Sequence, residues 1–172
     1  MTTEAGRLTV RLMEAQDVVL LAREVRLGRD HIEARWIERQ QGLRTIFVAE
    51  LGGRFAGSVS FDERPELPRL LHLFALAVAP ALHNRGIGSA LIAHVEEEAR
   101  RRGLDGVCLG VADGNAPARR LYERLGYRRE GDSYVSRWLW RGLSGAQREV
   151  VETVYRMFKR FQDDGGGPSQ VN

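Results

Sequence analysis

The feature of the sequence that most restricts the fold is an apolar strand joined to a helix by a short loop with two glycines. Residues 70–79 form a nearly continuous apolar run that ends at Pro80, which is typical of a strand covered on both faces. The loop His83-Asn84-Arg85-Gly86-Ile87-Gly88 follows, and residues 88–102 then carry apolar side chains with the spacing of an amphipathic helix. We therefore expect a mixed α/β fold with this strand inside the sheet.

The same loop suits a phosphate group. The first amides of a helix have no partner within the helix, and together with the helix dipole they form a binding site for an anion. Helices usually attract Asp or Glu to the first turn, yet residues 86–93 contain no acidic side chain, and Arg85 adds positive charge. A plain glycine-containing turn before a helix explains the spacing equally well, so this pattern alone leaves both interpretations open.

Two other phosphate-binding motifs are excluded. The chain has no Gly-Lys-Ser/Thr sequence and therefore no Walker loop. A dinucleotide fingerprint needs a third small residue, where this chain has Leu91, and it needs flanking βαβ repeats that the sequence lacks. A nucleotide-binding module is therefore a distant alternative.

The remaining segments predict a sheet flanked by helices. Alternating patterns and turn residues indicate strands over 8–13, 45–50, 54–61, 107–111, 127–130 and 134–140, and helical spacing indicates helices over 17–27, 31–41 and 116–125. Ser144 and Gln147 form a capping-box pattern before a stripe of apolar residues at Val150, Val151, Val154, Phe158 and Phe161. We expect an amphipathic helix over 144–162, packed on a domain formed by residues 1–143 or serving as a dimer interface. The glycine-rich tail, 163–172, is expected to be disordered.

Composition excludes several classes of protein. Hydrophobic residues make up 43% and charged residues 28% of the chain, an ordinary balance for a globular protein. The formal net charge of +3 comes from arginines spread along the chain, so we expect no nucleic-acid partner and favour an anionic small molecule. The single cysteine, Cys108, excludes an internal disulfide and a multi-cysteine zinc site, and we expect no metal. No segment approaches ~18 consecutive apolar residues, so we expect a cytoplasmic protein without membrane contact.

Three strings of the sequence, in this order, resemble the GCN5-related N-acetyltransferase (GNAT) superfamily. They are Leu76-Ala77-Val78-Ala79-Pro80, the loop from His83 to Gly88, and Asn115-Ala116-Pro117-Ala118-Arg119-Arg120-Leu121-Tyr122-Glu123-Arg124-Leu125-Gly126-Tyr127. The resemblance is strongest over residues 70–131. It implies a mostly antiparallel central sheet flanked by helices and splayed at the coenzyme-binding strands. The chain departs from the family at His83, where Gln or Arg is usual.

The resemblance implies that the chain binds acetyl-coenzyme A and transfers the acetyl group directly to a primary amine of a small molecule, peptide or protein. The residues implied to contact the coenzyme are Leu76, Ala77, Val78, His83, Asn84, Arg85, Gly86, Ile87, Gly88, Ser89, Asn115 and Ala118. The alternative is a non-catalytic acyl-coenzyme A sensor or interaction domain of the same fold. The acceptor amine has no readable signature, and we expect a monomer or a homodimer.

The resemblance also suggests catalytic residues. Tyr122 is similar to the family's usual general acid, and a phenol keeps its proton at neutral pH. His72 is a candidate base, since an imidazole titrates near physiological pH, although a lone histidine at the edge of an apolar run is more often structural. Other candidate bases are Asp62, Glu63, Glu50 and a chain of water molecules.

Two other residue types have less specific interpretations. Cys108 lies inside a predicted strand, so we expect a buried thiol rather than a nucleophile. Trp138 and Trp140 are expected in the core or in the wall of the acceptor site.

Overall fold

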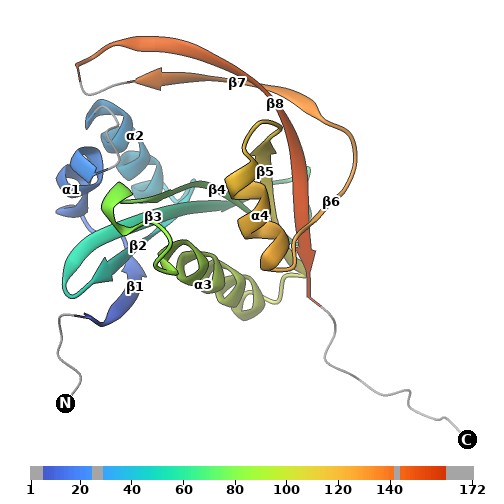
Figure 1. Cartoon of the computed structure of the whole chain (residues 1–172), viewed down its shortest axis with the longest axis horizontal. Coiled ribbons are helices and arrows are strands. Elements are labelled where there is room, and N and C mark those ends of the chain that lie inside the picture. Colours follow the sequence, from blue (N-terminus) through green and yellow to red (C-terminus); the bar gives the residue numbers. More distant parts are fainter. Residues whose placement is uncertain (1–5, 25–28, 142–143, 162–172) are drawn as a thin grey trace, which may run out of the picture.

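The strands and helices of the chain assemble around one twisted sheet (Figure 1). The computed structural model describes residues 6–24, 29–141 and 144–161. The strands are β1 (Leu8–Leu12), β2 (Thr45–Leu51), β3 (Arg54–Glu63), β4 (Leu70–Val78), β5 (Gly106–Ala112), β6 (Arg128–Arg129), β7 (Tyr134–Arg141) and β8 (Gln147–Arg160). The helices are α1 (Asp17–Glu24), α2 (Arg29–Gln40), α3 (Ile87–Arg101) and α4 (Ala116–Arg124), with a short 3-10 turn, η2, at Pro80–Leu82.

The strand order in the sheet is β1-β2-β3-β4-β5-β8-β6, and β7 pairs with β8 away from this path. All neighbouring pairs are antiparallel except β4 and β5, which run parallel from Leu70 opposite Gly106 to Leu73 opposite Leu109. Beyond Leu73 and Leu109 the two parallel strands no longer pair. The mostly antiparallel sheet, splayed between β4 and β5, confirms the predicted fold class.

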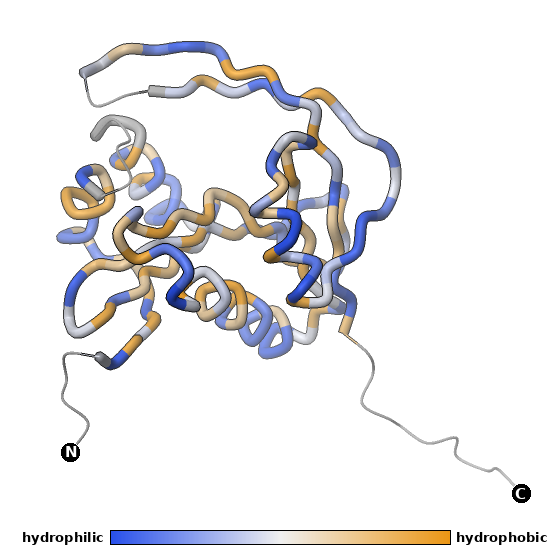
Figure 2. Tube along the Cα trace, in the orientation of Figure 1, coloured by the Kyte–Doolittle hydropathy of each residue, from blue (hydrophilic) through white to orange (hydrophobic). Residues whose placement is uncertain are grey.

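The two faces of the sheet carry different helices because side chains alternate along a strand. In β2, Ile46 and Val48 pack into a cluster with buried residues of α1 and α2, such as Leu21 and Ile32. Ala49 belongs to the larger cluster, which contains the buried face of α3 and the interior of β3, β4 and β5. Figure 2 shows apolar residues along these central strands and polar residues on the outer side of α3.

The predicted C-terminal helix over residues 144–162 is wrong, because residues 147–160 form strand β8. This segment also contradicts the predicted division after residue 143, since β8 lies inside the sheet, between β5 and β6. The spacing of the apolar residues in this segment matched one face of a helix. Tyr155 and Met157 lie off that face, yet both are buried, which a strand covered on both faces explains. The predicted tail, 163–172, lies outside the described residues.

Pairing with the edge of β5 explains why residues 147–160 are extended. Strand β5 pairs with β8 over its whole length, from Gly106 opposite Arg160 to Ala112 opposite Val154. A side chain at Gly106 would stand 2.2 Å from the carbonyl oxygen of Lys159, so only glycine allows the backbones to approach this closely. Valine and threonine at 150, 151, 153 and 154 also favour an extended chain. Tertiary pairing therefore overrides the helical spacing.

The N-terminal part of β8 and the whole of β7 form a two-stranded ribbon that leaves the sheet (Figure 1). Residues of β7 line a cavity together with residues of α2, so the ribbon faces α2 across the open end of the sheet. In the part of the chain that the structure describes, no helix has the length and apolar character needed to cross a membrane.

Candidate active site

The loop between β4 and α3 has the geometry of an anion-binding turn. Asn84 and Gly86 both adopt positive φ angles, of 60° and 77°. Gly86 is the N-cap of α3, no side chain caps this helix end, and the first turn contains no acidic residue. The amides of Ile87, Gly88 and Ser89 therefore remain available to an anion. Arg85 is exposed beside them.

His83 connects this loop to the end of β4. Its Nε2 donates a hydrogen bond to the carbonyl oxygen of Val78, over 3.0 Å. The side chain that departs from the family pattern therefore contacts the protein's own backbone. It holds the loop against the strand that is predicted to bind the coenzyme.

A bulge marks the point where β4 separates from β5. Ser58 of β3 pairs with Ala77 and Ser60 pairs with Phe74, so β4 has one extra residue in this interval. Ala75 lies within it, with a φ of 51°, which is unusual for a residue other than glycine. The parallel ladder ends at Leu73, just before the bulge, so the backbone of residues 76–78 has no partner in β5 and can offer its peptide groups to a ligand on that side.

A cavity of about 700 Å³ occupies this gap. Its walls come from β4, β5, α4, the β7–β8 ribbon and the α2 region. The described residues that line it include His72, Phe74, Leu76, Asn115, Ala118, Tyr122, Tyr134, Trp138, Glu152 and Arg156. The structure thus brings together the two predicted catalytic residues and three of the predicted coenzyme contacts. The loop residues 83–89 lie outside the lining of this cavity.

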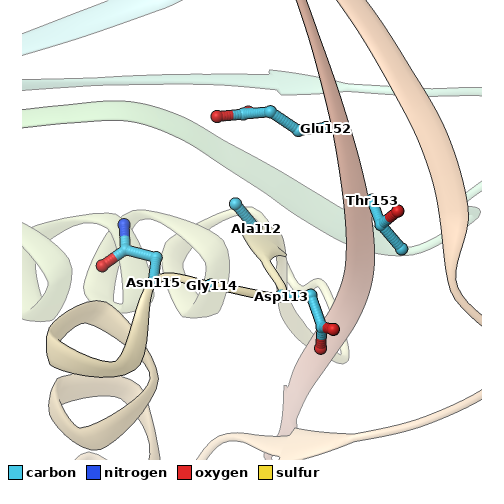
Figure 3. Close-up of a pocket in the computed structure, with 6 residues that line it drawn as sticks. All are labelled: Ala112, Asp113, Gly114, Asn115, Glu152 and Thr153. Atoms are coloured by element: carbon cyan, nitrogen blue, oxygen red, sulfur yellow. The ribbon is translucent and has the colours of Figure 1, made fainter.

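A neighbouring hollow of about 560 Å³ lies where β5 turns into α4, and Asn115 and Glu152 line both spaces. Figure 3 shows the Glu152 side chain extending from β8 on the same side as the Asn115 amide, whereas Thr153 points the other way. Asn115 is the N-cap of α4, and its Oδ1 accepts a hydrogen bond from the Ala118 amide. No other described residue forms a hydrogen bond with the side-chain nitrogen of Asn115, so this nitrogen can donate to a ligand.

Tyr122 is held in a buried position on α4. Burial raises the pKa of its phenol to about 12, so the hydroxyl keeps its proton at neutral pH. The Tyr122 ring packs edge-on against Tyr127, with 5.8 Å between the centroids. Tyr127 is fixed in turn, because its hydroxyl donates to Glu96, which also binds Lys159 at 2.7 Å. Packing and hydrogen bonds behind Tyr122 therefore restrict how its hydroxyl can move.

His72 is oriented by the strand beside it. Asp62 lies directly opposite His72 in the β3–β4 register, and the Nδ1 of His72 donates to Asp62 Oδ1 over 3.2 Å. Arg64 also binds this carboxylate, at 3.0 Å. Burial alone would raise the pKa of Asp62, but the hydrogen bonds from His72 and Arg64 outweigh burial and hold this pKa below its usual value. Asp62 is therefore an ionised partner that leaves Nε2 of His72 available to accept a proton.

The other predicted bases lie elsewhere. Glu50 binds Arg11 at the β1–β2 side of the molecule, and Glu63 binds Arg102 at the end of α3. Neither glutamate is among the described residues that line the cavity. Asp62 supports His72 instead of lining the cavity itself. Cys108 is fully buried, and burial raises the pKa of its thiol to about 11, so it lacks the thiolate character of a nucleophile.

Several cavity residues were missed in the sequence. Glu152 and Arg156 fell inside the segment predicted to be helical, and Arg35, Arg44 and Arg64 had no motif around them. A signal for the two charged residues was present in the sequence. If residues 150–156 are interpreted as a strand, Glu152 and Arg156 lie on the same face as Val150 and Val154. Of the two predicted wall residues, Trp138 lines the cavity and Trp140 does not.

The profile of the acetyltransferase (GNAT) family matches residues 13–127, which is more than half of the chain. The chain belongs to the GNAT acetyltransferase family. The match contains the β4–α3 loop, His72 and Tyr122, and it ends before the β7–β8 ribbon. No three His, Cys, Asp or Glu side chains gather in a metal-binding arrangement within the described ranges.

Relatives within the GNAT family match parts of the chain. A mycothiol acetyltransferase from Salinispora arenicola is 47% identical over 68 residues, which are 39% of this chain and 22% of that protein. The N-acetylaspartate synthetase of Rattus norvegicus is 28% identical over 157 residues, which are 90% of this chain and 52% of that protein. The chain thus spans about half or less of the length of these curated relatives.

Solved GNAT structures share the whole fold. The structure of YncA from Salmonella typhimurium with acetyl-CoA superposes with a TM-score of 0.67 at 20% sequence identity, and the match covers 95% of this chain and 99% of that one. The family match over residues 13–127 confirms the predicted family, and this superposition confirms the predicted fold. At this identity the likeness establishes the fold alone, so the coenzyme and catalytic residues of this chain remain predictions.

Proposed function

We propose that this GNAT domain transfers the acetyl group of acetyl-CoA directly to a primary amine. The observation that carries the proposal is the cavity between the splayed strands β4 and β5, where the phenol of Tyr122 and the imidazole of His72 line one space. A protonated group and a basic group are what thioester aminolysis requires. The acetyl-CoA bound to YncA, a protein of the same fold, supports the choice of cosubstrate.

The coenzyme would lie along the path that the loop and the strand define. The pyrophosphate would accept hydrogen bonds from the amides at the start of α3, with Arg85 at its side. The pantetheine arm would follow Leu76, Ala77 and Val78, whose peptide groups are exposed by the bulge, and would pass Asn115 and Ala118. The thioester would then lie in the cavity that His72 and Tyr122 line.

The chemistry then follows from the two side chains. Nε2 of His72 accepts a proton from the ammonium form of the acceptor, directly or through water, and Asp62 stabilises the imidazolium that results. The free amine attacks the thioester carbonyl, the C–N bond forms, and the C–S bond breaks. Tyr122 donates its proton to the departing thiolate, and the proton that the attacking nitrogen loses returns the Tyr122 phenolate to the phenol, directly or through water. No acyl-enzyme is needed.

A screen of primary amines with acetyl-CoA tests the proposed function, with release of the free coenzyme thiol as the readout. The panel should contain amino acids, polyamines, aminoglycosides and peptides with free N-termini. We expect acetylation of at least one acceptor class, dependent on acetyl-CoA. Tight acetyl-CoA binding without turnover on any amine would favour the alternative, a non-catalytic acyl-coenzyme A sensor. Cytoplasmic location and a monomeric or homodimeric state also stay predictions.

His72→Ala should lower kcat/KM for the amine by about 10²-fold and remove the acidic limb of the pH–rate profile. The reason is that this limb reports protonation of the base. The measurement is kcat/KM from acid to alkaline pH for the wild type and the variant. Glu63→Gln is the matched control and should change neither rate nor profile, because Glu63 binds Arg102 away from the cavity. If His72→Ala keeps the profile and Glu152→Gln loses the limb, Glu152 is the base.

Cys108→Ala should keep turnover within about twofold of the wild type, because direct transfer needs no thiol nucleophile. In the native protein the thiol should resist alkylation at neutral pH, since it is buried and its pKa is raised to about 11. The same thiol should react at once in denaturant. Rapid alkylation of the native protein, together with loss of activity in the alanine variant, would contradict direct transfer.

A further inference from the structure

The hydroxyl of Tyr134 occupies space that a side chain at Gly110 would need. A Cβ at Gly110 would stand 3.1 Å from the Tyr134 hydroxyl oxygen and 3.0 Å from Cγ1 of Val154. Gly110 is the first residue of β5 beyond the last parallel pair, in which Leu73 is opposite Leu109. The Tyr134 hydroxyl therefore lies at the point where β4 and β5 separate.

The Tyr134 ring reaches this point from the β7–β8 ribbon. Tyr134 is opposite Val154 of β8 in the strand register, and Arg156 of β8 is opposite Gly110 of β5. Residues opposite each other in paired strands, and residues two apart along one strand, share a face of the sheet. The guanidinium carbon of Arg156 lies 5.1 Å from the centroid of the Tyr134 ring. The ring therefore lies across β8, with its hydroxyl at β5.

The Tyr134 hydroxyl is open to a ligand. Tyr134 and Gly110 both line the cavity of about 700 Å³, and the Tyr134 residue is 39% exposed. No described residue forms a hydrogen bond with this hydroxyl. A phenol oxygen can accept a hydrogen bond as well as donate one. This cavity therefore contains a hydroxyl that is positioned by the fold and has no partner within the described ranges.

The proposed base lies on the same face of the sheet. His72 is opposite Cys108 in the β4–β5 register, and Gly110 comes two residues after Cys108. His72 and the hydroxyl at Gly110 therefore face the same space. Diagonal neighbours on adjacent strands are about 7–8 Å apart, a separation that one amine bound between the two side chains can span.

We propose that the Tyr134 hydroxyl binds the attacking nitrogen of the acceptor and holds it beside the thioester. This inference rests on the proposed acetyltransferase function, and it adds a substrate contact to those of His72 and Tyr122. One N–H of the acceptor's ammonium group gives its proton to His72, and the Tyr134 oxygen accepts a hydrogen bond from another. The nitrogen then keeps its place after its positive charge has gone, close to the thioester carbonyl. Glycine at position 110 leaves the room that this hydroxyl needs.

Tyr134→Phe tests the inference by removing only the hydroxyl. The probe is whichever of alanine, spermidine, kanamycin and glycylglycine the wild type acetylates fastest. Its kcat/KM should fall by about tenfold, the loss expected for one hydrogen bond to a charged group. The Kd of acetyl-CoA and the Tm should not change, because the hydroxyl has no partner among the described residues. A purely structural role would lower the Tm instead.

Tyr155→Phe is the matched control for Tyr134→Phe. Tyr155 follows Val154 on β8 and therefore points to the opposite face of the sheet, where its hydroxyl is buried. The control should keep the kcat/KM of the wild type. A Tyr134→Phe variant with the same kcat/KM as Tyr155→Phe would overturn the inference.

Gly110→Ala should also lower kcat/KM for the amine, because its methyl group displaces the Tyr134 hydroxyl. Both changes break the same contact, so the double variant Gly110→Ala/Tyr134→Phe should lose no more than the slower of the two single variants. Losses that multiply would overturn the inference. Tyr134→Phe alone provides the test if Gly110→Ala does not fold.

Fluorine NMR separates this inference from the proposed function, because it needs no turnover. The chain has four tyrosines, so in protein labelled with 3-fluorotyrosine the Tyr134→Phe variant identifies the Tyr134 resonance. At least one of the four amines, added to the coenzyme A complex, should shift this resonance. If no amine is acetylated and the resonance still shifts, the proposed function fails and the Tyr134 contact stands. If an amine is acetylated and Tyr134→Phe keeps full activity, the inference fails and the function stands. If no amine is acetylated and none shifts the resonance, both fail.

Discussion

Tyr122→Phe should lower kcat by ~10²–10⁴-fold, the usual contribution of a general acid, while the affinity for acetyl-CoA changes little. The substitution removes only the hydroxyl, and the ring keeps its edge-on contact with Tyr127. With a pKa of about 12, the phenol of Tyr122 is protonated throughout the working range of pH and can donate at every turnover. The measurement combines single-turnover kinetics with calorimetric titration of the coenzyme.

Tyr155→Phe is the matched control for Tyr122→Phe. The Tyr155 hydroxyl is buried without a hydrogen-bond partner among the described residues, so its removal should leave kcat unchanged and should keep or raise the free energy of unfolding. A Tyr122→Phe variant with full turnover, in an assay limited by chemistry, would remove Tyr122 from the mechanism. A slow variant with much weaker coenzyme binding would make Tyr122 a positioning residue.

Gly88→Glu should weaken coenzyme A binding by about a hundredfold or more, because it removes charge-assisted hydrogen bonds to the pyrophosphate and adds repulsion. A side chain at Gly88 would start 3.7 Å from Leu121, 3.8 Å from Val78 and 3.9 Å from Leu76, in the gap where the coenzyme would lie. The measurement is calorimetric titration of coenzyme A into a variant shown to be folded by circular dichroism.

Ala93→Glu is the matched control for Gly88→Glu. Ala93 is an exposed residue on the same helix, so this variant gains the same charge without entering the gap. It should bind coenzyme A as the wild type does. Equal affinities for the two glutamate variants would remove the start of α3 from the coenzyme site.

The part of the fold that was predictable from the sequence is the part with strong local signals. The apolar run of β4, the glycine loop and the amphipathic pattern of α3 each depend on nearby residues, and the structure has all three in the expected order. The start of α4 at Ala116 was predictable for the same reason. Local propensity and tertiary packing agree in these segments, so the sequence alone was sufficient.

The segment of β8 shows the opposite case. Its apolar positions fit a helix as well as a strand, and a capping pattern at Ser144 and Gln147 favoured the helix. What decided the outcome was the unpaired edge of β5, which lies almost fifty residues away in the chain and needs a partner for its backbone groups. The error also displaced Glu152 and Arg156 from the predicted site.

By itself, the sequence determined the strand–loop–helix unit that is proposed to bind the coenzyme, and the helix that carries Tyr122, because residues adjacent in the chain create these features. Only the tertiary structure decided the acceptor side of the cavity. Pairing of β3 with β4 brings Asp62 to His72, and strand β8 brings Glu152 and Arg156 to the cavity that Arg35 of α2 also lines. These charged side chains come from segments far apart in the chain. They come together only when the sheet has formed, so no local sequence pattern predicts that they share one cavity.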